Sequence, residues 1–259
     1  MIKGLYIATS GMLVNSAEID VRSNNIANVD TVGYKKENID VRSFPEVLIE
    51  RYNDKREFPP FSKDREIIGS MVLATVVNGT YLDKSEGPIH HTGNSFDLAL
   101  QGHGFFVVQD AEGNEYYTRA GNFTLDRDGQ LVTHQGYVVL GSGGPISVPS
   151  GAKFTVDSAG DVFIDGTQVD RLRVVDFKTP TYLKRIGDNL YKATKDSGEP
   201  VDAQGYVIKQ GYLEGSNVNI VYEMVNMIKA YRQFEAGQRV VLTNDETLRE
   251  AITNIPRTG

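Results

Sequence analysis

The four histidines are the first candidates for metal or acid–base chemistry, but their spacing does not assemble a site. His90 and His91 are adjacent, so on a strand they would point to opposite faces and hold one metal ion poorly. His103 lies between two glycines, and neither it nor His134 has a second group of ligands at the spacing of a zinc site. The chain contains no cysteine, which excludes a thiolate metal site and a cysteine nucleophile. We interpret the histidines as solvated or turn residues.

A second candidate is the segment that starts at Asp126, which resembles the beginning of a calcium-binding loop. The EF-hand pattern requires glycine at position six and glutamate at position twelve, but these positions hold Leu131 and Tyr137. The glycine-rich segments 102–104 and 141–144 carry neither the lysine of a phosphate-binding loop nor a dinucleotide fingerprint. The sequence therefore predicts no catalytic residue, no cofactor and no metal ion.

The elements that organise the chain are two apolar heptad series near its ends. The C-terminal series consists of Ile220, Met227, Phe234, Val241, Leu248 and Ile255. Positions i, i+4 and i+7 share one face of an α-helix, so Met224, Tyr231 and Ile252 would widen this stripe. Asn219 can cap the start, and residues 219–252 contain no proline and a single glycine, Gly237. The pattern predicts one helix about 50 Å long at roughly 1.5 Å per residue.

The N-terminal series predicts a partner helix over residues 2–28. Its apolar residues are Leu5, Met12, Ile19 and Ile26. On a neighbouring face lie Gly4, Ala8 and Gly11, small residues that would let a second backbone come close. We expect the two terminal helices to pair as a coiled coil. The alternative is that both are ordinary core helices of one globular domain, which general statistics of helix length favour.

Between the helices, short apolar runs alternate with glycine turns, as in antiparallel β proteins. Asp128-Gly129 and Asp165-Gly166 predict hairpins, because both central positions of a type I′ turn need positive φ. The predicted fold class is α+β, with long N- and C-terminal helices and a mainly antiparallel β central domain. We expect four parts: an N-terminal helix in 1–33, a linker with some extended structure over 34–75, a β-rich domain over 76–212, and a C-terminal helix in 213–259.

Composition excludes several classes of partner. The 259 residues include 27 basic and 34 acidic side chains, a net charge of −7, without a basic cluster of the nucleic-acid type, so no nucleic acid partner is expected. No apolar run reaches the roughly 18 residues of a membrane span, so no membrane insertion is expected. The N-terminal residues lack the apolar core and cleavage site of a secretory signal. Composition by itself predicts a cytosolic protein and leaves export by another route open.

One segment narrows the range of possible functions. Residues 24–35 read N-N-I-A-N-V-D-T-V-G-Y-K and resemble the signature N-N-[IL]-A-N-x-x-T-x-G-[FY]-[KR] of bacterial flagellar basal-body rod and hook proteins. By its residue types, this segment is a helix end rich in amides. Asn24, Asn25 and Asn28 can bond the backbone groups that the helix end frees, and Gly33 permits a sharp exit.

Further segments resemble motifs of the same family, in the same order along the chain. Residues 97–108 resemble its central D-[LV]-A-[IL]-x-G-x-G-[FW]-[FL] motif, and residues 117–123 resemble Y-T-R-x-G-x-[FI]. Residues 214–218 and 223–228 resemble [ET]-x-S-N-V and E-[ML]-V-x-M-I at the C-terminal helix. Within the family, segments 143–146 and 213–218 resemble proximal-rod members, and residues 55–73 lack a glycine-rich stretch usual in distal-rod members. A proximal-rod type is therefore favoured, with a distal-rod type next.

The resemblance implies a structural subunit, and not an enzyme, that polymerises into a hollow helical axle and transmits motor torque to the hook. It implies as partners further copies of the chain, other rod and hook subunits, and the flagellar type III export apparatus. It also implies a location in the periplasm-spanning rod of the basal body, reached without a cleavable signal peptide. Two alternatives stay open: a secreted β-rich binding or adhesin module, and a monomeric β-rich enzyme.

Assembly contacts are then expected on both heptad series and on the amide-rich segment. These residues are Leu5, Met12, Ile19, Asn24, Asn25, Ile26, Asn28, Gly33, Ile220, Met227, Phe234, Val241 and Leu248.

Overall fold

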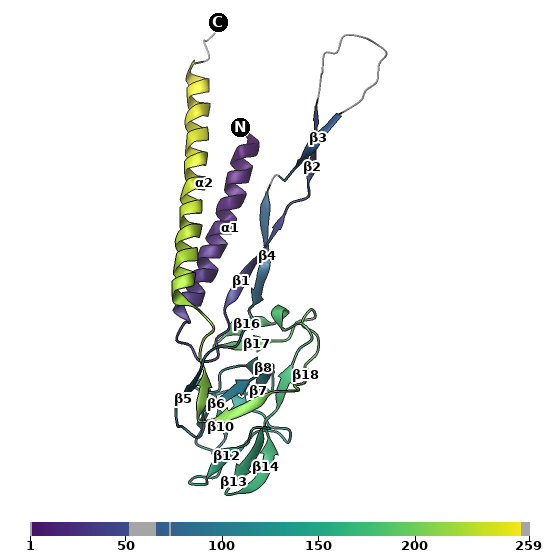
Figure 1. The fold of residues 1–259 in the computed structure, drawn as a ribbon, viewed down its shortest axis with the longest axis vertical. Helices are drawn as coiled ribbons and strands as arrows, with labels where there is room; N and C mark the ends of the chain where they lie inside the picture. Colours follow the sequence, from purple (N-terminus) through teal and green to yellow (C-terminus); the bar gives the residue numbers. More distant parts are fainter. Residues whose placement is uncertain (1, 52–65, 73, 255–259) are drawn as a thin grey trace. The chain divides into compact units, whose positions relative to one another are not determined.

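The computed structural model describes residues 2–51, 66–72 and 74–254 of the chain (Figure 1). The chain forms two compact units. The first, here called the helical unit, consists of Met1–Ser23, Ile39–Thr80 and Met224–Gly259. The second, here called the β unit, consists of Asn24–Asn38 and Tyr81–Glu223. The architecture is α+β, as predicted.

Two long helices, α1 (Ile2–Ala27) and α2 (Ile220–Asn254), supply most of the helical unit. Both predicted helices, 2–28 and 219–252, are confirmed to within two residues at each end. The Asn219 side chain caps α2, because its Oδ1 accepts a hydrogen bond from the Tyr222 backbone N–H at 3.0 Å.

The helices pack together most closely where Gly237 of α2 faces α1. A Cβ atom at Gly237 would lie 2.6 Å from Cγ of Met12 and 3.6 Å from the carbonyl oxygen of Ala8. The space beside Gly4 and Gly11 is open. The prediction that small residues of α1 bring the second backbone close is therefore wrong for Gly4 and Gly11, whereas the backbone of Ala8 does lie opposite Gly237. The missing side chain that permits the approach is on α2.

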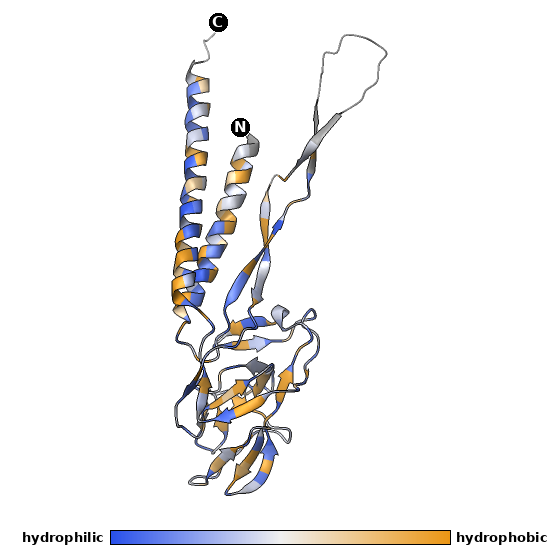
Figure 2. Ribbon diagram, in the orientation of Figure 1, coloured by the Kyte–Doolittle hydropathy of each residue, from blue (hydrophilic) through white to orange (hydrophobic). Residues whose placement is uncertain are grey.

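The heptad positions and the wider stripe differ in burial. Leu5, Met12 and Ile19 on α1 are half-buried, and so are Met227, Phe234, Val241 and Leu248 on α2. Ile255 lies outside the described residues. Met224, Tyr231 and Ile252 are exposed (46%, 56% and 72% of their surface), so the wider stripe does not face α1. Figure 2 shows apolar (orange) segments alternating with hydrophilic (blue) ones along both helices.

Residues 34–75, predicted to be a linker with some extended structure, contain paired strands. The strands are β1 (Glu37–Ser43), β2 (Val47–Arg51), β3 (Glu66–Met71) and β4 (Thr75–Leu82). β1 pairs with β4, and β2 pairs with β3 in antiparallel register from Val47 opposite Met71 to Arg51 opposite Glu66. The extended character was predicted, but the cross-strand pairing is visible only in the structure.

The β unit is built from short strands. They are β5 (Ile89–His91), β6 (Leu98–Gln101), β7 (Phe105–Gln109), β8 (Glu115–Thr118), β9 (Thr124–Leu125), β10 (Leu131–Val132), β11 (Val138–Val139), β12 (Phe154–Val156), β13 (Asp161–Ile164), β14 (Thr167–Arg171), β15 (Val174–Asp176), β16 (Lys184–Gly187), β17 (Leu190–Lys192), β18 (Val201–Asp202), β19 (Val207–Gln210) and β20 (Tyr212–Glu214). A 3₁₀ turn, η1 (Pro180–Tyr182), precedes β16.

A nine-stranded antiparallel sheet carries the core of the β unit. Its strand order is β16-β17-β8-β7-β11-β10-β9, and β15 joins it by pairing with β7 and β18. Successive side chains of β7 point to opposite faces. Phe106 and Val108 enter one buried apolar cluster, whereas Phe105 and Val107 enter the other. Both faces of β7 are therefore covered. Smaller sheets, β12-β13-β14, β6-β19 and β5-β20, complete the unit.

Three hairpin turns share one design, with aspartate at the first position and glycine at the fourth. Oδ1 of Asp110, Asp126 and Asp157 each accepts hydrogen bonds from the backbone N–H groups two and four residues later. The glycines Gly113, Gly129 and Gly160 have positive φ. The aspartate side chain thus organises the loop backbone through its own hydrogen bonds.

The two predicted type I′ turns had different outcomes. Asp165 and Gly166, between β13 and β14, both have positive φ (51° and 81°), as that turn type requires. The hairpin at Asp128-Gly129 exists between β9 and β10, but there only Gly129 has positive φ. The type I′ assignment is therefore wrong at this hairpin, because Asp126 makes it one of the longer aspartate turns described above.

Candidate functional site

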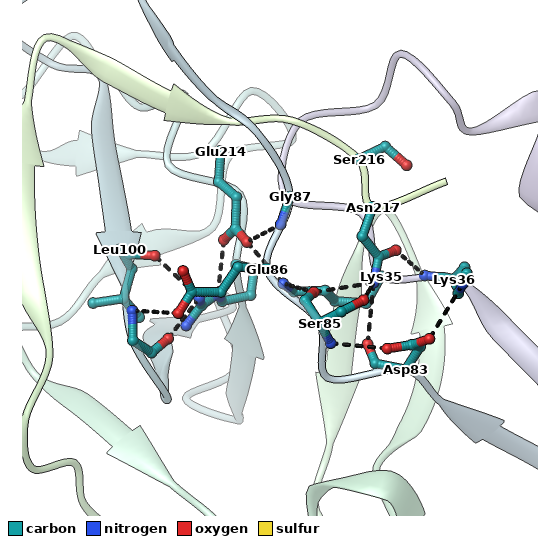
Figure 3. A network of polar contacts seen from close by, with 12 residues as sticks. Lys35, Lys36, Asp83, Ser85, Glu86, Gly87, Leu100, Glu214, Ser216 and Asn217 are labelled. Atoms are coloured by element: carbon teal, nitrogen blue, oxygen red, sulfur yellow. Dashed lines mark hydrogen bonds and ion pairs between the residues drawn. The ribbon is translucent and has the colours of Figure 1, made fainter. Parts of the chain in front are cut away.

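A buried polar network joins distant parts of the chain inside the β unit, around the carboxylate of Glu214 at the end of β20 (Figure 3). Nε of Arg119 donates to Glu214 Oε2 at 2.9 Å, and Nζ of Lys35 donates to Oε1 at 2.7 Å. The Gly87 backbone N–H also donates to Oε1, at 3.0 Å. The exposed fractions of Glu214, Arg119 and Lys35 are 1%, 3% and 6%. We call this set the polar junction.

The remaining donors of the two cations hold backbone carbonyls. Arg119 donates to the carbonyl oxygens of Gly104 (2.7 Å), Leu100 (3.0 Å) and Gly102 (2.8 Å). Lys35 donates to the carbonyl oxygen of Ser85 at 2.8 Å. The bonds from Arg119 pair buried backbone carbonyls of strand β6 and of the loop that follows it with charged donors, which offsets the cost of burying those carbonyls.

The junction shifts the pKa of its carboxylate downward. Burial by itself would raise the pKa of Glu214, but the charges of Arg119 and Lys35 and the hydrogen bonds to Lys35 and Gly87 outweigh it and hold that pKa below the usual range. Burial, reinforced by the charge of Arg119, lowers the pKa of Lys35 against the opposing effect of Glu214. One carboxylate is thus shared between two buried cations.

The Asn217 side chain connects the residues after β20 to the residues after the signature segment, residues 24–35. Its Oδ1 accepts from the Lys36 backbone N–H at 2.7 Å, and its Nδ2 donates to the carbonyl oxygens of Ser85 (3.1 Å) and Asp83 (3.3 Å). Lys36 and Asp83 also form an ion pair at 3.3 Å. The segments 35–36, 83–87 and 214–217 are therefore bonded side by side, as Figure 3 shows.

Asn25 occupies the centre of the signature segment and is fully buried. Its amide pairs with the Glu37 backbone in both directions: Nδ2 donates to the Glu37 carbonyl at 2.9 Å, and Oδ1 accepts from the Glu37 N–H at 3.0 Å. Oδ1 also accepts from the Tyr34 hydroxyl at 3.1 Å, and Nδ2 donates to Glu223 at 3.3 Å. An amide suits this place because it alone offers donors and an acceptor on one short side chain.

Gly33 makes the turn that lets the signature segment enter the junction. Its φ is +65°, and its N–H donates to the carbonyl oxygen of Glu214 at 2.7 Å. A Cβ atom there would lie 2.5 Å from the backbone N of Ala120 and from the carbonyl carbon of Arg119. Both the backbone conformation and the space therefore require glycine.

The other residues assigned from sequence to assembly lie in several environments. Asn24 is exposed, yet its Oδ1 accepts from the Tyr34 hydroxyl at 2.9 Å, and Asn28 is half-buried with its Nδ2 bonded to the Asn24 carbonyl at 2.8 Å. Ile26 is half-buried and Ile220 is exposed. Asn25 and Gly33 are thus engaged in intrachain hydrogen bonds, and the heptad residues lie outside the polar junction.

Sequence reasoning did not single out Glu214, Arg119, Lys35 or Asn217. A signal for them existed, because each is a polar member of a family motif: Lys35 ends the signature, Arg119 lies in Y-T-R, and Glu214 and Asn217 lie in E-G-S-N-V. Each motif is a local pattern, so the sequence does not indicate that these four residues share one location.

The helical unit offers a different kind of surface. A groove of about 480 Å³ lies between α1 and α2, and Met12, Leu13, Phe234, Val241 and Leu242 contribute its apolar lining. Val221, Val225, Ile228 and Leu242 on α2 are exposed (67%, 59%, 52% and 62%), as are Tyr6 and Leu13 on α1 (70% and 67%).

Neither surface has the composition of a metal centre. Among the described residues, no group of three or more His, Cys, Asp or Glu side chains is arranged to hold a metal ion. Within the same part of the chain, no helix combines the length and the apolar character needed to cross a bilayer.

Comparison with known proteins matches the sequence along most of its length. The family model for a flagella basal body rod protein matches residues 5–35. The model for the flagellar hook protein FlgE/F/G D1 domain matches residues 99–164, and the model for the flagellar basal body rod FlgEFG protein C-terminal matches residues 209–254. Each matched range contains residues of the polar junction.

Individual relatives are similar over nearly their whole length. The flagellar basal-body rod protein FlgG of Bacillus subtilis (strain 168) is 34% identical, covering 97% of this chain and 98% of that protein. FlgG of Agrobacterium fabrum is 34% identical, over 95% of this chain and 96% of the relative. The flagellar basal-body rod protein FlgF of Caulobacter vibrioides is 34% identical, over 98% of each chain.

Proposed function

This chain belongs to the bacterial flagellar basal-body rod protein family, and we propose that it polymerises, through its paired terminal helices, into a hollow helical axle that transmits motor torque to the hook. In this role it is a structural rod subunit that performs no catalysis. The donors of Arg119 and Lys35 support this, because they are engaged by carbonyls and a carboxylate of the same chain.

The observation that carries the proposal is the exposed apolar face of the helix pair. Val221, Val225, Ile228 and Leu242 are more than half exposed although they lie on one long helix. Large apolar side chains exposed on one helix indicate an interaction site, and long helices depend on packing of their apolar faces for stability. Further subunits that cover this face would bury it. Such contacts join different patches on the two partners, and contacts of this type build open helical filaments.

The proposed assembly contacts follow from this arrangement. The heptad residues Leu5, Met12, Ile19, Ile26, Ile220, Met227, Phe234, Val241 and Leu248 would line an inner layer of helices. Asn24 and Asn28 would act at the neighbouring helix end, where Asn24 is exposed. Asn25 and Gly33 would act indirectly, by holding the signature segment in place. In this scheme residues 1–33 and 213–259 form the inner layer, and residues 76–212 form the outer domain.

The partners, route and position in the rod are part of the same proposal. Other rod and hook subunits would bind at the ends of this subunit's stack. The flagellar type III apparatus would export the chain to the periplasm-spanning rod without a cleavable signal peptide. We favour an FlgF-like proximal position because segments 143–146 and 213–218 resemble that member, with an FlgG-like distal position next. Identity of 34% to both FlgF and FlgG relatives leaves this choice to the motifs.

A matched pair of substitutions tests the exposed helix face. Val225 on α2 and Val169 on β14 of the β unit have the same exposure, 59%. In cells that lack the native gene, we expect Val225→Asp to be exported but to form no complete rods, because burying an unpaired carboxylate costs several kcal/mol in every subunit. We expect Val169→Asp to support normal rods. Electron microscopy of basal bodies and immunoblots of exported protein make the comparison. Complete rods at the normal frequency with Val225→Asp would refute the proposed face.

A further inference from the structure

A group of lysines lies on the β unit, where β16 and β17 form one edge of the nine-stranded sheet. Segments 178–184 and 192–197 are bonded side by side there, since β16 pairs with β17 and the Thr194 hydroxyl donates to the carbonyl oxygen of Tyr182 at 2.8 Å. Together the two segments contain four lysines, all exposed, and one acidic residue, Asp196. We call Lys178, Lys184, Lys192 and Lys195 the lysine cluster.

The strand register sets two of these lysines against each other. Lys184 of β16 lies directly opposite Lys192 of β17, so both side chains are on one face of the sheet. Like charges in such a cross-strand pair destabilise it. Among the described residues, none of the four lysine side chains makes a hydrogen bond or an ion pair. An anionic partner would therefore relieve a repulsion that the chain itself leaves uncompensated.

The opposite charge is carried by the three-stranded sheet β12-β13-β14, here called the acidic sheet. Residues 154–170 contain four aspartates and no lysine or arginine. Asp157 and Asp165, in the two turns of this sheet, are exposed, whereas Asp161 pairs with Arg171 at 3.2 Å. Within the β unit, the acidic sheet and the β16–β17 edge lie at opposite ends (Figure 1). The aspartates therefore cannot neutralise the lysine cluster of their own chain.

We propose that the lysine cluster of one subunit contacts the acidic sheet of a second copy of the chain. The inference rests on the proposed polymerisation, since it names one contact of that polymer. Charge complementarity identifies the occupant: segments 178–184 and 192–197 contribute +3 to a net charge of −7, so the rest of each copy carries −10. Each subunit offers one cluster and accepts another at its far end. Such a heterologous contact adds subunits without closing a dimer.

Rod assembly in cells that lack the native gene tests the contact. We expect the double variant Lys184→Glu/Lys192→Glu to be exported normally but to reduce the number of complete rods at least tenfold. Two like charges still face each other in this variant, so the strand pair itself is not made worse. The matched control, Lys153→Glu, reverses the charge of an exposed lysine beside the acidic sheet and should leave rods normal. Equal rod counts for the double variant and the control would overturn the contact.

A charge exchange identifies the partner. Thr167→Lys/Gln168→Lys adds two positive charges at exposed positions of β14, in the acidic sheet. By itself this pair should also reduce the number of rods. In a chain that carries Lys184→Glu/Lys192→Glu as well, both surfaces have exchanged sign, and rods should be restored. Loss of rods without restoration would assign the lysines to an anionic partner other than the acidic sheet, which would overturn the proposal.

Monomer stability separates this contact from a role inside the subunit. Lys192→Glu alone places opposite charges across β16 and β17, so it should raise the midpoint of thermal unfolding of the full-length chain and still lower the number of rods. A fall in both quantities would mean that the lysines act by holding the strand pair, and would overturn the proposal. Val225→Asp keeps the two proposals apart: normal rods with that variant would refute the helical face, whereas normal rods with the double lysine variant alone would refute only this contact.

Discussion

At the scale of single residues, the family motifs are explained by one buried constellation. Glu214 accepts from two cations that lie 179 and 95 positions away in the sequence. The Asn25 side-chain amide makes two hydrogen bonds to the Glu37 backbone, as a residue of a neighbouring strand would. Few other residue types could take these positions. Each side chain is paired with a particular set of donors and acceptors in a place from which water is excluded.

The carboxylate of Glu214 makes stability depend on acid pH. Its pKa is lower in the folded chain than in the unfolded chain, so the folded chain binds fewer protons in acid. The stabilisation is therefore complete above the ordinary pKa of glutamate, about 4.3, and is lost as the pH falls through the lower folded value. We expect Glu214→Gln to lower the free energy of unfolding by about 3–5 kcal/mol at pH 7, because both cations lose their counter-charge.

Urea unfolding followed by tyrosine fluorescence at pH 7 and in acid measures this effect. The difference between the wild-type chain and Glu214→Gln should shrink in acid, where the wild-type carboxyl is also neutral. Glu199→Gln, at an exposed position, serves as the control and should behave as the wild type at both pH values. A difference that is independent of pH would contradict the role given to the carboxylate.

Alanine substitutions at Gly33 and Gly205 separate two costs in folding free energy: that of the left-handed backbone conformation and that of steric crowding. Their φ values are similar, +65° and +71°, but only a Cβ at Gly33 would strike backbone atoms, those of Arg119 and Ala120. We expect Gly205→Ala to cost about 1–2 kcal/mol, the price of the left-handed conformation. Gly33→Ala should cost on the order of 3 kcal/mol or more, since rigid backbone must also move. If both variants lost the same free energy of unfolding in a chemical denaturant, the backbone around Gly33 would be able to shift at little cost.

At the scale of elements, local sequence rules explain the helices and turns, and contacts explain the exceptions. The heptads place half-buried residues along α1 and α2, and three aspartates each organise a hairpin. Gly237 is the exception, because glycine weakens a helix unless something needs the space. Here the space holds Met12.

Gly237 and Gly11 form a matched pair on the two helices. Gly11→Ala adds a methyl group to open space on α1, so we expect it to stabilise the helix by about 0.8–1 kcal/mol. Gly237→Ala should gain nothing or lose stability, because its Cβ would displace Met12. Thermal unfolding followed by far-UV circular dichroism distinguishes them. A similar rise in the midpoint for both variants would show that the two helices do not pack closely at Gly237.

At the scale of the whole molecule, the two units differ in how they are stabilised. Both clusters of buried apolar side chains lie in the β unit, and nearly all of its β7 strand is inaccessible. In the described part of the helical unit, the heptad residues reach only half burial. Stability is therefore unevenly distributed, and the helical unit gains most from a polymer.

Limited proteolysis of the monomer tests this difference. We expect cleavage first in residues 2–23 and 224–254, while residues 81–223 resist. Cuts within 39–80 should leave peptide 24–38 attached to the resistant fragment. Three hydrogen bonds would hold it there: Asn25 Nδ2 to Glu223, Lys35 Nζ to Glu214, and the Lys36 N–H to Asn217. Mass spectrometry after gel filtration identifies the retained peptides. Loss of peptide 24–38 from the fragment, or equal protection of α2 and the β unit, would contradict this picture.

The sequence by itself determined the elements that depend on neighbours along the chain. Helix periodicity, the cap at Asn219, the Asp165-Gly166 turn and the family motifs are local patterns, because backbone geometry repeats over a few residues. The strands of residues 34–75 were only partly predicted, since a strand is completed by a partner that the local pattern does not name.

Only the tertiary structure decided which distant residues meet. Nothing local indicates that Lys35, Arg119 and Glu214 share one site, or that Gly237 rather than Gly4 or Gly11 sets the approach of the helices. Hydrogen bonds, ion pairs and packing act through space over a few ångströms, and the fold alone brings residues far apart in the chain within that distance.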